Sequence, residues 1–128
     1  MLIGTIPSSF GNLLNLVYLS SRFNNLQGVI STSLYNLSSL QKLDLQNNKF
    51  GGSLPNYYGD KFPQLWSLAL NGNKFHGHIP LSLFNCLMLE LIQLDNNSFS
   101  GTIPSSVGIR DCPNCALTTM KVRGKSCC

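Results

Sequence analysis

The sequence predicts an α/β solenoid, a right-handed superhelix in which each coil adds one short strand to a parallel sheet on the concave side. Three observations predict this fold. The pattern Leu-x-x-Leu-x-Leu-x-x-Asn-x-(Leu/Phe)-x-Gly-x-(Ile/Leu)-Pro recurs four times in the 128 residues. The copies are 24 or 25 residues apart, the length of one coil in several repeat proteins. The Leu-x-Leu core of the pattern, as in Leu43-Asp44-Leu45 and Leu68-Ala69-Leu70, alternates with period two, as in a strand with one buried face.

The four copies share one register. They begin at Leu16, Leu40, Leu65 and Leu89, and a half repeat occupies residues 1–15. We therefore expect the repeats to fill residues 1–108. The return path of each coil should run over the convex side on short 3₁₀ turns and loops. There Leu13, Leu37 and Cys86 occupy equivalent positions, which predicts one buried column.

One asparagine recurs at the same position of every copy: Asn24, Asn48, Asn73 and Asn97. These amides are expected to point inward and to satisfy backbone groups where the chain turns off the strand. We call this set the asparagine ladder and expect it to be structural, without ligand contacts. Asn47, the outward neighbour of Asn48, is expected to tolerate alanine.

The repeat register ends after Gly108, because Pro113 stands where a fifth strand would need leucine. Residues 109–128 are rich in cysteine and basic residues, and we expect them to pack loosely. The cysteines are Cys112, Cys115, Cys127 and Cys128. Three interpretations of these cysteines remain open: a zinc site, a redox pair or a tail tied by a disulfide. Adjacent cysteines make a strained second zinc hook, so neither metal nor cofactor is expected.

Composition argues against several classes of function. Charged residues make up 11% of the chain and the formal net charge is +4, most of it after residue 109. We expect no nucleic-acid binding, and no apolar run is long enough to cross a membrane. No copy supplies a nucleophile, a base and an orienting group together, so no enzyme is expected. His76 and His78 alone make a poor metal site.

The motif Asn-x-Leu-x-Gly-x-Ile-Pro resembles the plant-specific class of leucine-rich repeats, and the resemblance covers residues 2–108. The elongated return after Ser53-Leu54-Pro55 is similar to the ectodomains of plant receptor-like Ser/Thr kinases. The subfamily includes the bacterial elongation-factor receptor and the rice blight-resistance receptor. The resemblance implies recognition at the outer face of a plant cell in defence or development signalling. Since residue 1 lies in mid-repeat and no signal peptide is recognisable, we expect a fragment of such a receptor.

Any ligand is expected on the outward positions of the strands, where the alternation excludes a core role. A peptide or protein is the expected ligand, with a co-receptor as a further partner and no membrane contact by this segment. The candidate contacts are Tyr18, Arg22, Phe23, Lys42, Asp44, Gln46, Trp66, Asn71, Gln93 and Asp95.

Other functions remain open. Plant inhibitors of microbial polygalacturonases and plant antifreeze proteins have similar repeats, and the missing signal peptide also admits an intracellular scaffold. Ice binding favours regular, weakly charged arrays, which the charged residues of the strands interrupt. Asn36 and Asn96 begin glycosylation sequons, which matter if the chain passes through the secretory pathway.

Overall fold

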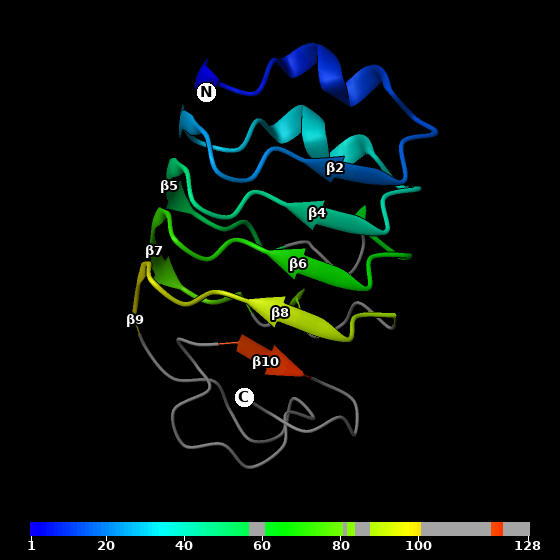
Figure 1. The fold of residues 1–128 in the computed structure, drawn as a ribbon. Coiled ribbons are helices and arrows are strands. Elements are labelled where there is room, and N and C mark those ends of the chain that lie inside the picture. The colour runs from blue at the N-terminus through cyan, green and yellow to red at the C-terminus, as the bar shows by residue number, and fades with distance from the viewer. Residues whose placement is uncertain (57–60, 81, 84–87, 101–118, 122–128) are drawn as a thin grey trace.

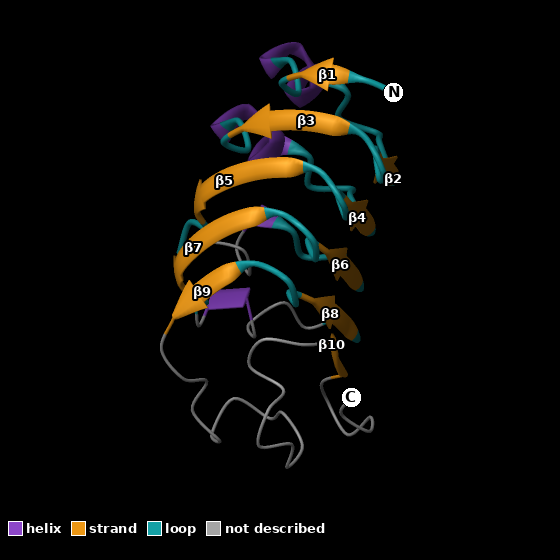
Figure 2. Cartoon of the chain, turned by 60° about the vertical axis from the view of Figure 1, so that its left-hand side comes forward, coloured by secondary structure: helices purple, strands orange, loops and turns teal. Residues whose placement is uncertain are grey.

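The computed structural model describes residues 1–56, 61–80, 82–83, 88–100 and 119–121. Over these residues the chain winds into a stack of coils, and each full coil contributes two strands to two different sheets (Figures 1 and 2). The predicted α/β solenoid with a parallel sheet is confirmed.

The first sheet, called sheet 1, contains the strands that the repeat pattern predicts. These are β2 (Tyr18–Ser20), β4 (Lys42–Asp44), β6 (Ser67–Ala69) and β8 (Leu91–Gln93). They pair in parallel, with Leu43 opposite Leu19 and Leu68, and Ile92 next to Leu68. Equivalent repeat positions therefore line up across the sheet.

The second sheet, called sheet 2, was not predicted. It consists of β1 (Ile3–Gly4), β3 (Asn25–Gly28), β5 (Lys49–Ser53), β7 (Lys74–His78) and β9 (Ser98–Ser100), all parallel. It follows the asparagine ladder in each coil. The glycines of the repeat pattern in this segment are residues that usually mark a turn. Backbone bonds between coils instead make this segment a strand, and Gly28, Gly52 and Gly77 lie in it with positive φ.

The return path begins with 3₁₀ turns, as predicted, in η1 (Ser8–Asn12) and η2 (Thr32–Asn36). Ser31, which replaces the proline of the pattern, caps η2 by accepting a hydrogen bond from the backbone N of Ser33 at 3.3 Å. The predicted buried column was wrong at Leu13, which is 49% exposed while Leu37 is fully buried. No described coil covers the outer side of the Leu13 coil. Cys86 and residues 57–60 lie outside the described residues.

The core fills the space between the two sheets and the return path. The leucines of the pattern are fully buried from Leu40 to Leu89. Phe75 is the middle of a stack of three rings. It lies 6.5 Å from Phe50 and 6.2 Å from Phe99 between ring centroids, with nearly parallel planes.

One strand lies beyond the repeats. β10 (Thr119–Lys121) pairs antiparallel with β8, with Met120 opposite Ile92 (Figure 2). The repeat register does not predict this strand. Residues 101–118 and 122–128, with all four cysteines of the tail, lie outside the described residues, so the zinc, redox and disulfide alternatives stay untested.

Candidate ligand-binding face

The candidate site is the outward face of sheet 1, formed by the side chains that alternate with the partly buried Leu19 and the buried Leu43, Leu68 and Ile92. Neighbouring strands of a sheet are about 4.8 Å apart. Side chains at equivalent positions of successive coils therefore lie in contact range across the strands. The stacking of β2, β4, β6 and β8 brings together residues that are 24 or 25 positions apart (Figure 1).

Exposed aromatic and basic side chains gather at the first coil of this face. Tyr18 and Phe23 are 60% and 61% exposed. The Arg22 guanidinium carbon lies 6.0 Å from the centroid of the Phe23 ring, at the limit of a cation–π contact. Exposed rings beside an arginine are the side chains that most often dominate a binding interface.

A second cation–π pair joins the next two coils. Lys42 Nζ lies 6.0 Å from the centroid of the Trp66 ring. Both residues are partly buried. The pair holds a flat ring and a charge together in the middle of the face.

A chain of polar contacts crosses three coils beside these rings. Arg22 lies 3.9 Å from Asp44 Oδ2, and Gln46 donates to the same carboxylate through its backbone N at 3.3 Å and through Nε2 at 3.2 Å. Asn71 Nδ2 then donates to Gln46 Oε1 at 3.3 Å. These bonds fix the side chains before any ligand arrives, which lowers the entropy cost of binding.

The expectation that the alternation leaves the outward positions exposed is wrong for part of the face. Asp44 is 4% exposed, Ser67 is 2% exposed and Ala69 is 3% exposed. Arg22 and Gln46 close over Asp44, and Ser67 lies between Lys42 and Leu91 on the adjacent strands. Alternation tells which face a residue is on, whereas the neighbours' sizes decide its exposure. Asp44 therefore positions Arg22 and Gln46.

The last coil presents acceptors. Gln93 and Asp95 are partly buried, and Asp95 Oδ2 accepts a bond from Asn96 Nδ2 at 3.3 Å. Among the described residues, the buried side-chain atoms without a hydrogen-bond partner are Ser21 Oγ in the first coil, Asn71 Oδ1 in the third and Asp95 Oδ1 in the last. The face is therefore asymmetric, with Arg22 at one end and acceptors at the other.

The asparagine ladder lies beneath this face and is engaged with the backbone. Asn73 Oδ1 accepts from the backbone N of Phe50 at 3.0 Å, and its Nδ2 donates to Leu45 O at 2.9 Å and Leu70 O at 3.0 Å. Asn48 and Asn97 repeat the arrangement, and Asn24 Oδ1 accepts from Leu2 N. Each amide bonds to its own coil and to the preceding one.

The repeat pattern did not predict a second set of equivalent positions, which share a left-handed backbone conformation. Phe23, Asn47, Gly72 and Asn96 occupy equivalent positions and all have left-handed φ angles, between 55° and 69°. This conformation turns the chain off sheet 1 in every coil. Asparagine and glycine at this position were the available signal, since both tolerate it better than other residues.

The two sequons lie at different places. Asn36 ends η2 on the return path and is exposed, and Asn96 is exposed at the left-handed turn after β8. A glycan at Asn96 would therefore stand at the edge of the sheet 1 face.

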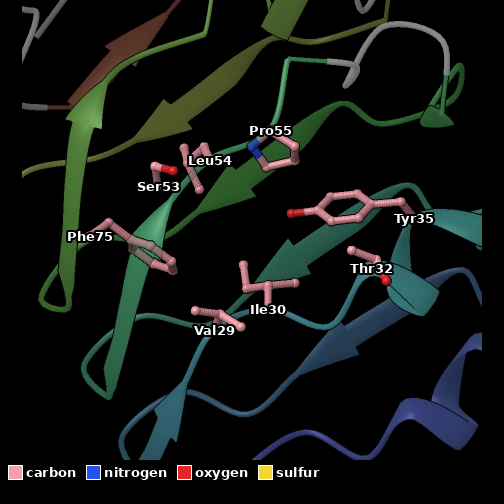
Figure 3. A pocket seen from close by; sticks show the side chains of 8 residues that line it. All are labelled: Val29, Ile30, Thr32, Tyr35, Ser53, Leu54, Pro55 and Phe75. Atoms are coloured by element: carbon pink, nitrogen blue, oxygen red, sulfur yellow. The ribbon is translucent and has the colours of Figure 1, made fainter.

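A separate apolar pocket lies between sheet 2 and the return path. It has a volume of about 190 Å³. Figure 3 shows the side chains of Ile30, Tyr35 and Phe75 around it, with Val29 next to Ile30. Within the described residues no group of three or more metal-ligating side chains occurs. None of the helices described there has the length and apolar character to cross a membrane.

Comparison with known proteins identifies the coils. The family model Leucine Rich Repeat matches residues 39–60 and 88–108. The solved ectodomain of the plant membrane receptor kinase GASSHO1/SCHENGEN3 from Arabidopsis thaliana, in complex with CASPARIAN STRIP INTEGRITY FACTOR 2, is 35% identical over 81% of this chain, with a TM-score of 0.76. The plant peptide hormone receptor RGFR1, in complex with RGF2, is 39% identical over 80%, with a TM-score of 0.77.

The same fold also occurs in a protein of another function. A plant ice-binding protein is 31% identical over 80% of this chain, with a TM-score of 0.76. The chain spans only 12% of the GASSHO1/SCHENGEN3 structure, 16% of RGFR1 and 33% of the ice-binding protein. No curated protein matches it by sequence.

Proposed function

The chain is a plant-type leucine-rich repeat protein that resembles part of a plant receptor-kinase ectodomain, and on that premise we propose that the sheet 1 face binds a peptide or protein ligand outside the cell. The segment contributes recognition, in a receptor for defence or development signalling, and no catalysis. A co-receptor is a further proposed partner.

The observation that carries this proposal is the composition and order of the sheet 1 face. Exposed Tyr18 and Phe23 stand beside Arg22, and the polar chain from Arg22 to Asn71 spans three coils. Aromatic anchors with fixed polar partners are the features of a protein-binding surface. A strand-like peptide laid across the coils would meet a cation first and acceptors last.

The same features do not favour ice binding. Arg22 is largely exposed, and Lys42 and Asp95 are reachable on the face. An array for ice needs regular small polar groups, and large charged and aromatic side chains break that regularity. Inhibition of a polysaccharide hydrolase has no specific support in the described residues.

A peptide selection tests the proposal directly. Random peptides of about twelve residues, long enough to cross four coils in extended form, are displayed and selected on the purified chain. We expect enriched peptides to lose about tenfold or more in affinity with Arg22→Ala and with the pair Lys42→Glu and Asp95→Lys. The matched control is Lys61→Glu, because Lys61 is exposed and lies outside both sheets.

Two outcomes would contradict the proposal. One is that no peptide is enriched more strongly on the parent chain than on a variant in which Tyr18 and Arg22 are both alanine. The other is that Lys61→Glu weakens the selected peptides as much as the changes on sheet 1 do.

A further inference from the structure

We propose that the outer face of sheet 2 is a second binding surface, which takes an extended acidic polypeptide segment. This surface is separate from the face to which the proposed function assigns the ligand. It is built from the outward side chains of β3, β5 and β7, which are neighbouring strands of sheet 2; Figure 2 shows the strands side by side.

The first observation is the segregation of charge. The strands of sheet 2 carry Lys49, Lys74, His76 and His78 and no acidic residue. All four side chains are exposed. Among the described residues no carboxylate lies within ion-pair distance of either lysine. Asp44 lies in β4 of sheet 1, and Asp95 follows β8 of the same sheet. A face with cations and no anions favours a negatively charged partner.

The second observation is a hollow in this face. A shallow, open depression of about 410 Å³ is lined by Thr5, Gln27, Val29, the two lysines and the glycines Gly28, Gly51 and Gly52. Gly51 lies opposite Lys74 on the neighbouring strand. Because glycine has no side chain, the position beside the Lys74 cation is open. A volume of this size accommodates several residues of a peptide.

The third observation is the spacing of the donors. Lys74, His76 and His78 alternate along β7, so successive outward side chains are about 6.6 Å apart. An extended polypeptide with an acidic residue at every second position has the same repeat. Lysine donates to a carboxylate as a cation, and a neutral imidazole still donates one N–H. The backbone N–H and C=O groups of the strands pair within the sheet, so side chains carry the recognition.

The occupant is therefore distinguished by the order of its charges. We expect a peptide of about ten residues that alternates Glu and Thr to bind about fivefold more tightly than one with the same composition in two blocks. Amide shifts in the NMR spectrum of the labelled chain should change at residues 27–28, 49–53 and 74–78 and remain constant in sheet 1.

Three variants test the location. The pair Lys49→Gln and Lys74→Gln should weaken the alternating peptide about fivefold to tenfold. Gly51→Leu should weaken it without unfolding the chain, because a Cβ on Gly51 meets nothing nearer than Lys74 O at 3.6 Å. The matched pair Lys61→Gln and Lys121→Gln removes the same charge outside sheet 2, because Lys61 lies in neither sheet and Lys121 belongs to β10 beside β8, and should leave the affinity unchanged.

The outcomes separate the alternatives. Equal losses of peptide affinity in the sheet 2 lysine pair and in the matched control pair would show that the peptide is attracted by net charge alone. That result would overturn the proposal. Binding of polygalacturonate with the same dependence on Lys49 and Lys74, while neither peptide binds, would overturn the peptide as occupant. Loss of sheet 1 binding by Arg22→Ala leaves these measurements unaffected, so the two proposals fail independently.

Discussion

At the scale of single residues, Phe23 combines an unfavourable backbone conformation with an exposed side chain. Its φ angle is 57°, and its ring is 61% exposed. A residue with a Cβ in the left-handed region costs about 1–2 kcal/mol, and asparagine costs less. We expect Phe23→Asn to raise the free energy of unfolding by about 1 kcal/mol, measured by urea denaturation.

The matched variant is Phe23→Ala, which removes the ring and keeps the backbone cost. Its stability should remain close to that of the parent chain, and both variants should bind the selected peptides less well. A gain in stability with alanine as large as that with asparagine would show that the ring, and not the φ angle, is the cause. Strain of this kind is retained at functional positions.

The asparagine ladder should be the most sensitive set of polar side chains. Asn73 makes one bond as acceptor and several as donor to buried backbone groups. We expect Asn73→Ala to lower the free energy of unfolding by about 1–3 kcal/mol, because buried partners lose their bond. Asn71→Ala, which removes one bond on the same turn, should cost less. Equal losses in the two variants would contradict the structural role of the ladder.

Asn47 shows what residue-level reasoning from the sequence leaves out. The sequence predicted that Asn47→Ala would be nearly neutral, since the side chain points outward. The structure gives Asn47 a φ of 56°, so alanine should cost about 1 kcal/mol and glycine less. Periodicity predicts the direction of a side chain, and it carries no information about the sign of φ.

At the scale of elements, sheet 1 could be predicted and sheet 2 could not. β4 and β6 lie in the Leu-x-Leu alternation of the repeat pattern, and β8 lies in its variant Ile92-Gln93-Leu94. β5 and β7 each bury one apolar residue, Phe50 and Phe75, and contain glycines that usually mark turns. Their hydrogen bonds come from neighbouring coils, and a pattern within one coil does not report those bonds.

The phenylalanine stack should hold sheet 2 in place. Phe75 lies between two rings and is 1% exposed, whereas Phe99 ends the stack and is 6% exposed. We expect Phe75→Ala to cost about 3–5 kcal/mol and Phe99→Ala clearly less, because a residue at the end leaves a smaller enclosed cavity. Calorimetric melting of the two variants compares them. A larger loss at Phe99 would show that the stack is not centred on Phe75.

At the scale of the whole molecule, the first coil presents an apolar end. Leu2, Ile3, Leu13 and Leu14 are between 49% and 78% exposed. A solenoid coil buries its apolar side only against a neighbour. We expect the purified chain to self-associate at micromolar concentrations, and Leu13→Glu with Leu14→Glu to make it monomeric in sedimentation experiments.

The control for this prediction is Met88→Glu. Met88 is 58% exposed at the other end of the described coils. Self-association should persist in that variant. Association that disappears equally with Met88→Glu would assign the contact to a different surface.

The period of the repeat was sufficient to predict the overall architecture, because one register repeated over four coils leaves few ways to stack them. It was insufficient for the ligand. The face of sheet 1 is made of positions that the repeat leaves free, and Asp44 shows that even their exposure depends on neighbours in other coils. The strand β10 follows no repeat and was out of reach for the same reason.

The direction in which the asparagine ladder links the coils, each to the one before it, has a mechanical consequence. Asn48, Asn73 and Asn97 each tie their own coil to the coil before it. A pulling force applied to the two ends should therefore release coils singly, each rupture breaking one rung. One released coil of 24 or 25 residues lengthens the chain by about 80 Å. A force–extension trace should show a regular sawtooth of that spacing, and Asn73→Ala should lower only the peak of its own coil.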